Sequence, residues 1–239
     1  MDDLDTTSRK RRNGTAARPL LGMTVLAVED SKFTCEALRQ MCLRSGARIR
    51  RADCLRSARR HLKVYRPCIA IVDLGLPDGN GAELISEMAQ AVPRVGAIIG
   101  ISGTPAAEQT ARDAGADTFL SKPIDSLAGF QAAVIAQLPR DWQPVGPRVL
   151  NEENVDPDPA AYRDDMAHVA NILAQHSDGP TIDYVAQFLG GIARTARDNS
   201  LAQAADDLAQ SHSAGRPITA NLDRLANLVQ ARLEPSHAV

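Results

Sequence analysis

The sequence predicts a doubly wound α/β domain with a parallel sheet, followed by a small all-α helical bundle. Three observations lead to this expectation. Short apolar runs alternate with amphipathic stretches from Met23 to about Leu138, these runs are apolar along nearly their whole length, and residues 160–239 show helical spacing alone. Strands without polar alternation are typical of a parallel sheet that helices cover on both faces.

The alternating region contains five strand–helix units. The strands are expected at residues 24–28, 47–52, 68–72, 96–101 and 118–120. The helices are expected at residues 31–45, 55–65, 84–92, 104–115 and 127–138. Gly46, Pro67 and Gly115 stop three of these helices, and Pro105 takes the first helical position of the fourth.

Composition divides the chain into four parts. They are a disordered tail (residues 1–21), the α/β domain (22–139), a proline-rich linker (140–159) and the bundle (160–239). The bundle is expected to contain roughly four helices. Thr181 would cap the second of them. Gly190 and Gly191 fall inside that helix, and each weakens it by about 1 kcal/mol.

Overall composition narrows the class of protein. A net charge of -2 gives no global attraction to nucleic acid or to anionic membranes. No apolar run approaches the roughly 20 residues that span a bilayer, and the N-terminus does not resemble a signal peptide. We therefore expect a cytoplasmic protein without membrane contact. Four cysteines without metal-ligand spacing are expected to be reduced packing residues: Cys35, Cys42, Cys54 and Cys68.

Polar side chains follow four of the five expected strands. Glu29 and Asp30 follow the first, Asp73 the third, Ser102 the fourth and Lys122 the fifth. In open parallel sheets, ligands bind beyond the carboxyl ends of the strands, so these residues should converge. Three adjacent carboxylates repel one another, and an all-oxygen acidic cluster suits Mg²⁺.

The predicted cluster has the groups that phosphoryl transfer requires. Asp73 ends the central strand, and an aspartate that attacks a phosphoryl donor forms an acyl phosphate. The oxygens of the transferring group need positive charge and hydrogen-bond donors. Mg²⁺, Lys122 and the Ser102 hydroxyl can supply them.

Four sequence elements, in this order, resemble bacterial response-regulator receiver domains. They are Val28-Glu29-Asp30-Ser31, Ile71-Val72-Asp73-Leu74-Gly75-Leu76-Pro77-Asp78-Gly79-Asn80-Gly81, Ile101-Ser102-Gly103 and Phe119-Leu120-Ser121-Lys122-Pro123. The resemblance covers residues 23–138 and implies a flavodoxin-like (βα)5 fold. It also implies that a histidine kinase or phosphotransfer protein phosphorylates Asp73 with Mg²⁺ as cofactor. The chain would then be a signalling protein that catalyses only its own phosphorylation and dephosphorylation.

The resemblance implies a role for each site residue. Mg²⁺ would be held by Asp30, Asp73, the Gly75 carbonyl and, through water, Glu29. Lys122 would pair with the phosphate. Ser102 would move toward the phosphate and Phe119 would swing inward behind it, a population shift between two packings.

Each of these residues also has an ordinary structural interpretation. Taken alone, Asp73 would be a cap or turn residue, Ser102 a turn residue and Lys122 a solvent-exposed side chain. Phe119 would be part of the core. Two positions depart from the commonest pattern of the family: Ser102 replaces a more usual threonine, and Gly75 is small for its place beside the acceptor.

The C-terminal helices leave three kinds of output open. The leading hypothesis is protein–protein output, through a downstream partner or a homodimer. A DNA-binding regulator is an alternative, although acidic residues are mixed among the arginines of these helices. A phosphorelay bundle is the third, but none of His168, His176 and His212 is followed by the Lys-Gly pair typical of phosphotransfer domains.

Overall fold

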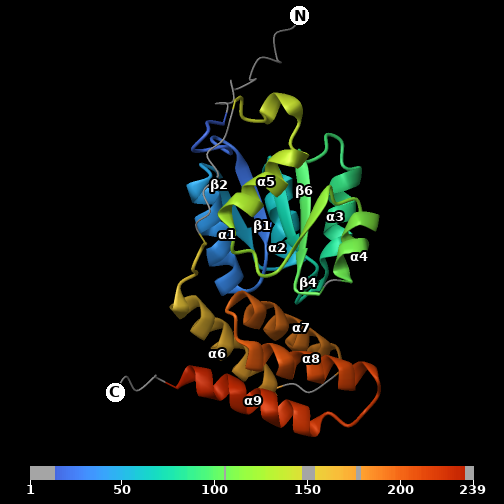
Figure 1. Cartoon of the computed structure of the whole chain (residues 1–239). Coiled ribbons are helices and arrows are strands. Elements are labelled where there is room, and N and C mark those ends of the chain that lie inside the picture. Colours follow the sequence, from blue (N-terminus) through green and yellow to red (C-terminus); the bar gives the residue numbers. More distant parts are fainter. Residues whose placement is uncertain (1–13, 105, 147–153, 176–178, 235–239) are drawn as a thin grey trace, which may run out of the picture.

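The computed structural model describes residues 14–104, 106–146, 154–175 and 179–234. Figure 1 shows an α/β domain and, beneath it, a layer of C-terminal helices. Helix α7 (Gly179–Thr195) lies next to the α/β domain, and α9 (Thr219–Leu233) lies on the far side of the helical layer (Figure 1). None of the described helices is long and apolar enough to cross a membrane.

The sheet confirms the predicted fold. Its five parallel strands lie in the order β2-β1-β3-β6-β7. These strands are β1 (Thr24–Val28), β2 (Arg48–Ala52), β3 (Ile69–Asp73), β6 (Ala97–Ser102) and β7 (Thr118–Ser121). This is the flavodoxin-like order, with its topological switch point between β1 and β3. A separate two-stranded hairpin follows β3 and consists of β4 (Gly75–Leu76) and β5 (Gly79–Asn80).

Both faces of the sheet are buried. Along β1, Val25 and Ala27 belong to one core cluster, whereas Leu26 and Val28 belong to the cluster on the opposite face. This alternation of two apolar faces explains why the strand is apolar along its whole length. The covering helices are α1 (Lys32–Arg44), α2 (Leu55–Val64), α3 (Gly81–Gln90), α4 (Ala107–Asp113) and α5 (Leu127–Gln137).

The C-terminal helices form a bundle with its own core. Helices α6 (Pro159–Gln175) and α8 (Asn199–Ser213) complete the four-helix set with α7 and α9. Their buried residues form one hydrophobic cluster, and Phe33 from α1 belongs to it. The core of the bundle therefore continues into the α/β domain.

The structure differs in detail from several of the expectations drawn from the sequence. Leu20 lies in the predicted tail but is fully buried, because its amide bonds to the Ser45 carbonyl at 2.9 Å and its side chain joins the core. Val155 lies in the predicted linker but is buried in the same core. Helix α4 begins at Ala107, and Pro105 lies outside the described residues. Thr181 is inside α7 rather than its cap.

Candidate functional site

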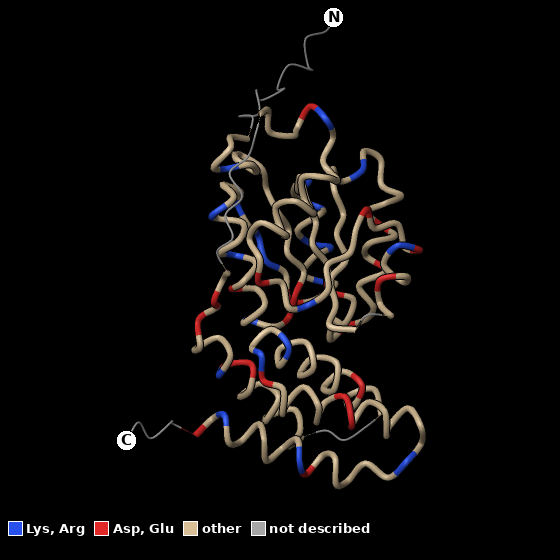
Figure 2. The backbone as a smooth tube through the Cα atoms, in the orientation of Figure 1, with Lys and Arg blue, Asp and Glu red and all other residues tan. Residues whose placement is uncertain are grey.

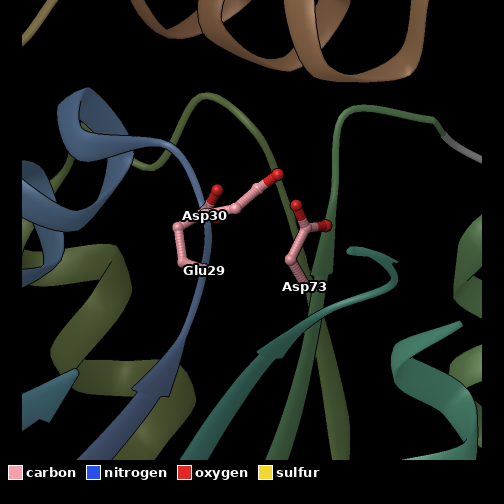
Figure 3. A group of neighbouring side chains, drawn as sticks. All are labelled: Glu29, Asp30 and Asp73. Atoms are coloured by element: carbon pink, nitrogen blue, oxygen red, sulfur yellow. The ribbon is translucent and has the colours of Figure 1, made fainter. Parts of the chain in front are cut away.

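Five predicted site residues come together at the carboxyl edge of the sheet. Glu29 and Asp30 follow β1, Asp73 ends β3, Ser102 ends β6, and Lys122 follows β7. The pairing of Val28 with Val72 and of Asp73 with Ile101 sets these strand ends at one level. One carboxylate oxygen each from Glu29, Asp30 and Asp73 lies within 4.8 Å of the others, as Figure 3 illustrates.

A single buried ammonium connects two of the carboxylates. Lys122 Nζ lies 2.7 Å from Glu29 Oε2 and 2.8 Å from Asp73 Oδ2. The side chains of Lys122, Glu29 and Asp73 are 4%, 1% and 8% exposed, so water screens these ion pairs little. The Lys122 amide also donates to the Ser102 carbonyl, which fixes the backbone from which the ammonium reaches inward.

Burial and repulsion make Glu29 and Asp30 hard to ionise. Burial, followed by the charge of Asp73, raises the pKa of Asp30 to about 7, against the lowering effect of a hydrogen bond from Tyr184. Burial also raises the pKa of Glu29 above its ordinary value, although Lys122 opposes this. Burial alone lowers the pKa of Lys122, but Asp73 and Glu29 outweigh burial and the net shift is upward. The cluster thus holds more potential negative charge than one ammonium neutralises.

The donor set fits a small divalent cation. Asp30 Oδ1 is buried and has no hydrogen-bond partner among the described residues, so this oxygen is desolvated without compensation. Oxygen ligands from carboxylates are those that Mg²⁺ prefers. Glu29, Asp30 and Asp73 would hold the ion. The predicted ligand role of the Gly75 carbonyl remains a prediction.

Ser102 and Phe119 differ in how they relate to the cluster. Ser102 is buried and lines the same cavity as Asp73, and its hydroxyl oxygen accepts a bond from the Thr104 amide at 3.2 Å. Phe119 does not line that cavity. It is half-buried in β7 and packs against the cluster beneath α3 and α4. The structure therefore places Ser102 at the site and Phe119 behind it.

Sequence reasoning missed the residues that the bundle brings to the site. Tyr184 Oη donates to Asp30 Oδ2 at 2.7 Å, and Gln187, Phe188 and Gly191 of α7 line the cavity beside Asp73. That cavity measures about 10 Å³. Figure 3 shows a helix passing over the carboxylates. The sequence offered one weak signal, a pair of glycines in the middle of an otherwise regular helix.

A second contact from the bundle holds the start of α1. Asp165 is 2% exposed and accepts hydrogen bonds from Ser31 Oγ, the Lys32 amide and the Phe33 amide, at 2.8, 2.9 and 3.0 Å. Free amides at a helix N-terminus attract negative charge, so this carboxylate is well placed. The start of α1 lies directly after Glu29 and Asp30, so the contact borders the acidic cluster.

The α/β domain is similar to one protein family and to two curated proteins. Residues 25–133 match the family model described as the response regulator receiver domain. The KDP operon transcriptional regulatory protein KdpE of Escherichia coli is 34% identical over 128 residues, which cover 53% of this chain and 56% of that protein. The virulence transcriptional regulatory protein PhoP of Salmonella typhimurium is 43% identical over 63 residues, 26% of this chain and 28% of that protein.

A solved structure is similar over about half of the chain. A putative response regulator from Chloroflexus aurantiacus is 26% identical, with a TM-score of 0.47, and the match covers 49% of this chain and 98% of that one. The present chain spans about half the length of KdpE and less of PhoP.

Proposed function

We propose that the chain is a two-component response regulator, because residues 25–133 match the family model of the response regulator receiver domain. In this proposal, a histidine kinase or phosphotransfer protein phosphorylates Asp73 in a Mg²⁺-dependent reaction in the cytoplasm. The observation that carries the proposal is the buried triad of Asp73, Lys122 and Glu29 at the carboxyl edge of the sheet. Beside it lies Asp30 Oδ1, which has no hydrogen-bond partner in the described part of the chain.

The chemistry follows from the positions of these groups. An Asp73 carboxylate oxygen attacks phosphorus, the P–N bond of the donor phosphohistidine breaks, and the imidazole leaves as an acyl phosphate forms on Asp73. Bound Mg²⁺ would supply positive charge to the phosphoryl oxygens. Lys122 already lies 2.8 Å from Asp73 Oδ2, so its ammonium can pair with the transferred group. The Ser102 hydroxyl, in the same cavity, can donate a hydrogen bond to it.

For the output we propose protein–protein contact, with a downstream protein or a second copy of the chain as partner. DNA binding requires arginines or lysines that are free to meet phosphates. In the bundle, Arg194, Arg224 and Arg232 instead pair with Asp206, Asp207 and Asp198. Figure 2 shows acidic and basic residues mixed over these helices. KdpE and PhoP are both named as transcriptional regulatory proteins, so transcriptional regulation is the alternative output.

The phosphorelay alternative has less support. His168 is exposed and contacts the Phe188 ring, with the ring centroids 5.8 Å apart. His212 bonds to Asp183 at 2.7 Å. Neither histidine lines the cavity beside Asp73, and His176 lies outside the described residues.

Labelling by acetyl phosphate with Mg²⁺ tests the acceptor. Intact-mass measurement should show a single phosphoryl group on the wild-type chain and none on Asp73→Asn. The matched control is Asp113→Asn, which changes an exposed aspartate of α4 and should label as the wild type does. Equal labelling of Asp73→Asn would show that the acceptor lies elsewhere.

A further inference from the structure

Helix α7 closes the site. The cavity beside Asp73 is lined by Lys122 and Ser102 from the receiver domain and by Gln187, Phe188 and Gly191 from α7. Its volume of about 10 Å³ is near the lower limit for one water molecule, roughly 10–15 Å³. A phosphoryl group is larger than a water molecule, and its donor must approach from the side that α7 occupies. The docked bundle therefore leaves no room for the reaction.

Polar contacts hold this closed arrangement at the reacting groups themselves. The Tyr184 hydroxyl donates to Asp30 Oδ2, the second oxygen of the carboxylate whose Oδ1 is the candidate metal ligand. Asp165 takes three hydrogen bonds from the first residues of α1, immediately beyond Asp30. Phe33, in the same turn, is buried in the bundle core. The docking contacts and the metal ligands thus share one short segment, residues 29–33.

Glycines allow the helix to approach this closely. A Cβ atom on Gly103 would lie 3.2 Å from the Cα atom of Gly191, so the α7 backbone lies directly on the loop after β6. A Cβ atom on Gly191 would lie 3.7 Å from Lys122 Nζ. Alanine therefore fits at position 191, whereas a longer side chain would extend into the Lys122 site. These contacts give Gly191 a packing role that offsets its poor helix propensity.

We propose that the C-terminal bundle is a built-in lid, and that docking of α7 and phosphorylation of Asp73 exclude each other. The inference rests on the proposed function, because it concerns regulation of that same site. Phosphoryl transfer requires release of α7, and the acyl phosphate then holds the bundle released. A partner that binds only the released bundle must therefore favour phosphorylation of Asp73. By thermodynamic linkage, phosphorylation raises the affinity for this partner by the same free energy by which the partner favours phosphorylation.

Labelling rates in the full chain test the lid. Tyr184→Phe removes one hydroxyl, and Gly191→Leu wedges α7 away from Lys122; neither changes a receiver residue. With acetyl phosphate and Mg²⁺, Tyr184→Phe should label roughly tenfold faster than the wild type, the effect of losing one hydrogen bond to a charged group. Gly191→Leu should label at least as fast as Tyr184→Phe. Gly191→Ala should label no faster than the wild type, because its methyl group fits the space and favours the helix. The control Asp223→Asn, which changes an exposed residue of α9, should keep the wild-type rate.

Hydrogen exchange gives a readout that does not depend on labelling. Beryllofluoride with Mg²⁺ mimics the acyl phosphate, and its binding can be followed by fluorine NMR. Its addition to the wild-type chain should speed exchange at the Lys32 and Phe33 amides, which donate to Asp165, and along α7.

The outcomes separate the two proposals. Beryllofluoride binding without faster exchange, together with equal labelling rates in all variants, would overturn the lid and leave Asp73 as acceptor. No labelling of any variant and no beryllofluoride binding would overturn the proposed function, and the lid with it.

Discussion

Gly75 follows Asp73 by two residues and carries no side chain because the bundle fills the space above it. A Cβ atom at this position would collide with the side-chain amide of Gln187. In the sequence, Gly75 departs from the commonest pattern of the family because it is small for its place beside the acceptor. The reason for it lies on α7, more than a hundred positions further along the chain.

The Gly75→Ala substitution should weaken docking of α7, because the Gln187 side chain must move away from the new methyl group. Hydrogen exchange along residues 179–195 should therefore become faster in Gly75→Ala than in the wild type. In a Gln187→Ala background, which removes the obstructing amide, the same substitution should leave exchange unchanged. Equal acceleration in both backgrounds would mean that the methyl group acts through the receiver rather than through Gln187.

No described residue forms a hydrogen bond with Asp30 Oδ1, and the metal prediction rests on this oxygen. Asp30→Asn should weaken Mg²⁺ binding by at least the roughly 10- to 100-fold that loss of an outer-shell partner costs. Isothermal titration calorimetry with Mg²⁺ alone measures the affinity. The exposed Asp53 on the same domain provides the control, since Asp53→Asn should bind Mg²⁺ as the wild type does. An unchanged affinity in Asp30→Asn would remove Asp30 from the ligand set.

At the scale of elements, one carboxylate joins three helices of the bundle. Asp198 caps α8 by accepting the Leu201 amide, and it takes a bidentate pair from Arg232 on α9 at 2.7 and 3.0 Å. The Tyr162 hydroxyl on α6 also donates to it. Burial alone raises the pKa of Asp198, but Arg232 and the Leu201 amide outweigh burial and hold that pKa well below its ordinary value.

Asp198→Asn should destabilise the bundle by about 2 kcal/mol, because it removes the charge from a network of hydrogen bonds. The depressed pKa fixes the sign of the pH effect. The stabilisation is fully present above the unfolded pKa of about 3.9 and is lost as pH falls toward the lower folded value. Urea unfolding at pH 7 and pH 3 should therefore show a smaller difference between variant and wild type at pH 3. Asp207→Asn, which breaks a more exposed pair with Arg224, should cost less than about 1 kcal/mol.

The sequence predicted elements whose signals are local. Strands β1, β3 and β6 were evident because both faces are buried, and α1 was evident from its apolar spacing and the Gly46 stop. Five site residues followed from the strand ends, whereas Gly75 and Phe119 were predicted from the resemblance to receiver domains. The docking of α7 did not, because helical periodicity shows which face of a helix is apolar but not what covers it. The bond between Ser31 and Asp165 joins residues 134 positions apart, and no local pattern encodes it.

Over the whole molecule, the core of the receiver extends beyond the segment that composition marks out. Leu20 and Val155 flank residues 23–138 on either side, and both are buried in the cluster beneath α1 and α5. Val155 reaches this core because its amide bonds to the Asp125 carbonyl at 2.9 Å. Val155, four residues before α6, is therefore anchored to the receiver core.

Two fragments of the chain test separately whether the flanking residues stabilise the receiver and whether the bundle limits labelling of Asp73. Residues 14–158 keep Leu20 and Val155, whereas residues 23–138 lose both. Full burial of one aliphatic side chain contributes about 1.5–3 kcal/mol, so the longer fragment should be more stable by about 3 kcal/mol or more in urea unfolding. Both fragments lack the lid, so the longer one should accept phosphate from acetyl phosphate at the rate of full-length Tyr184→Phe or faster. Equal urea midpoints would show that the flanking residues do not belong to the receiver core. A fragment that labels as slowly as the intact wild type would show that the bundle does not limit access to Asp73.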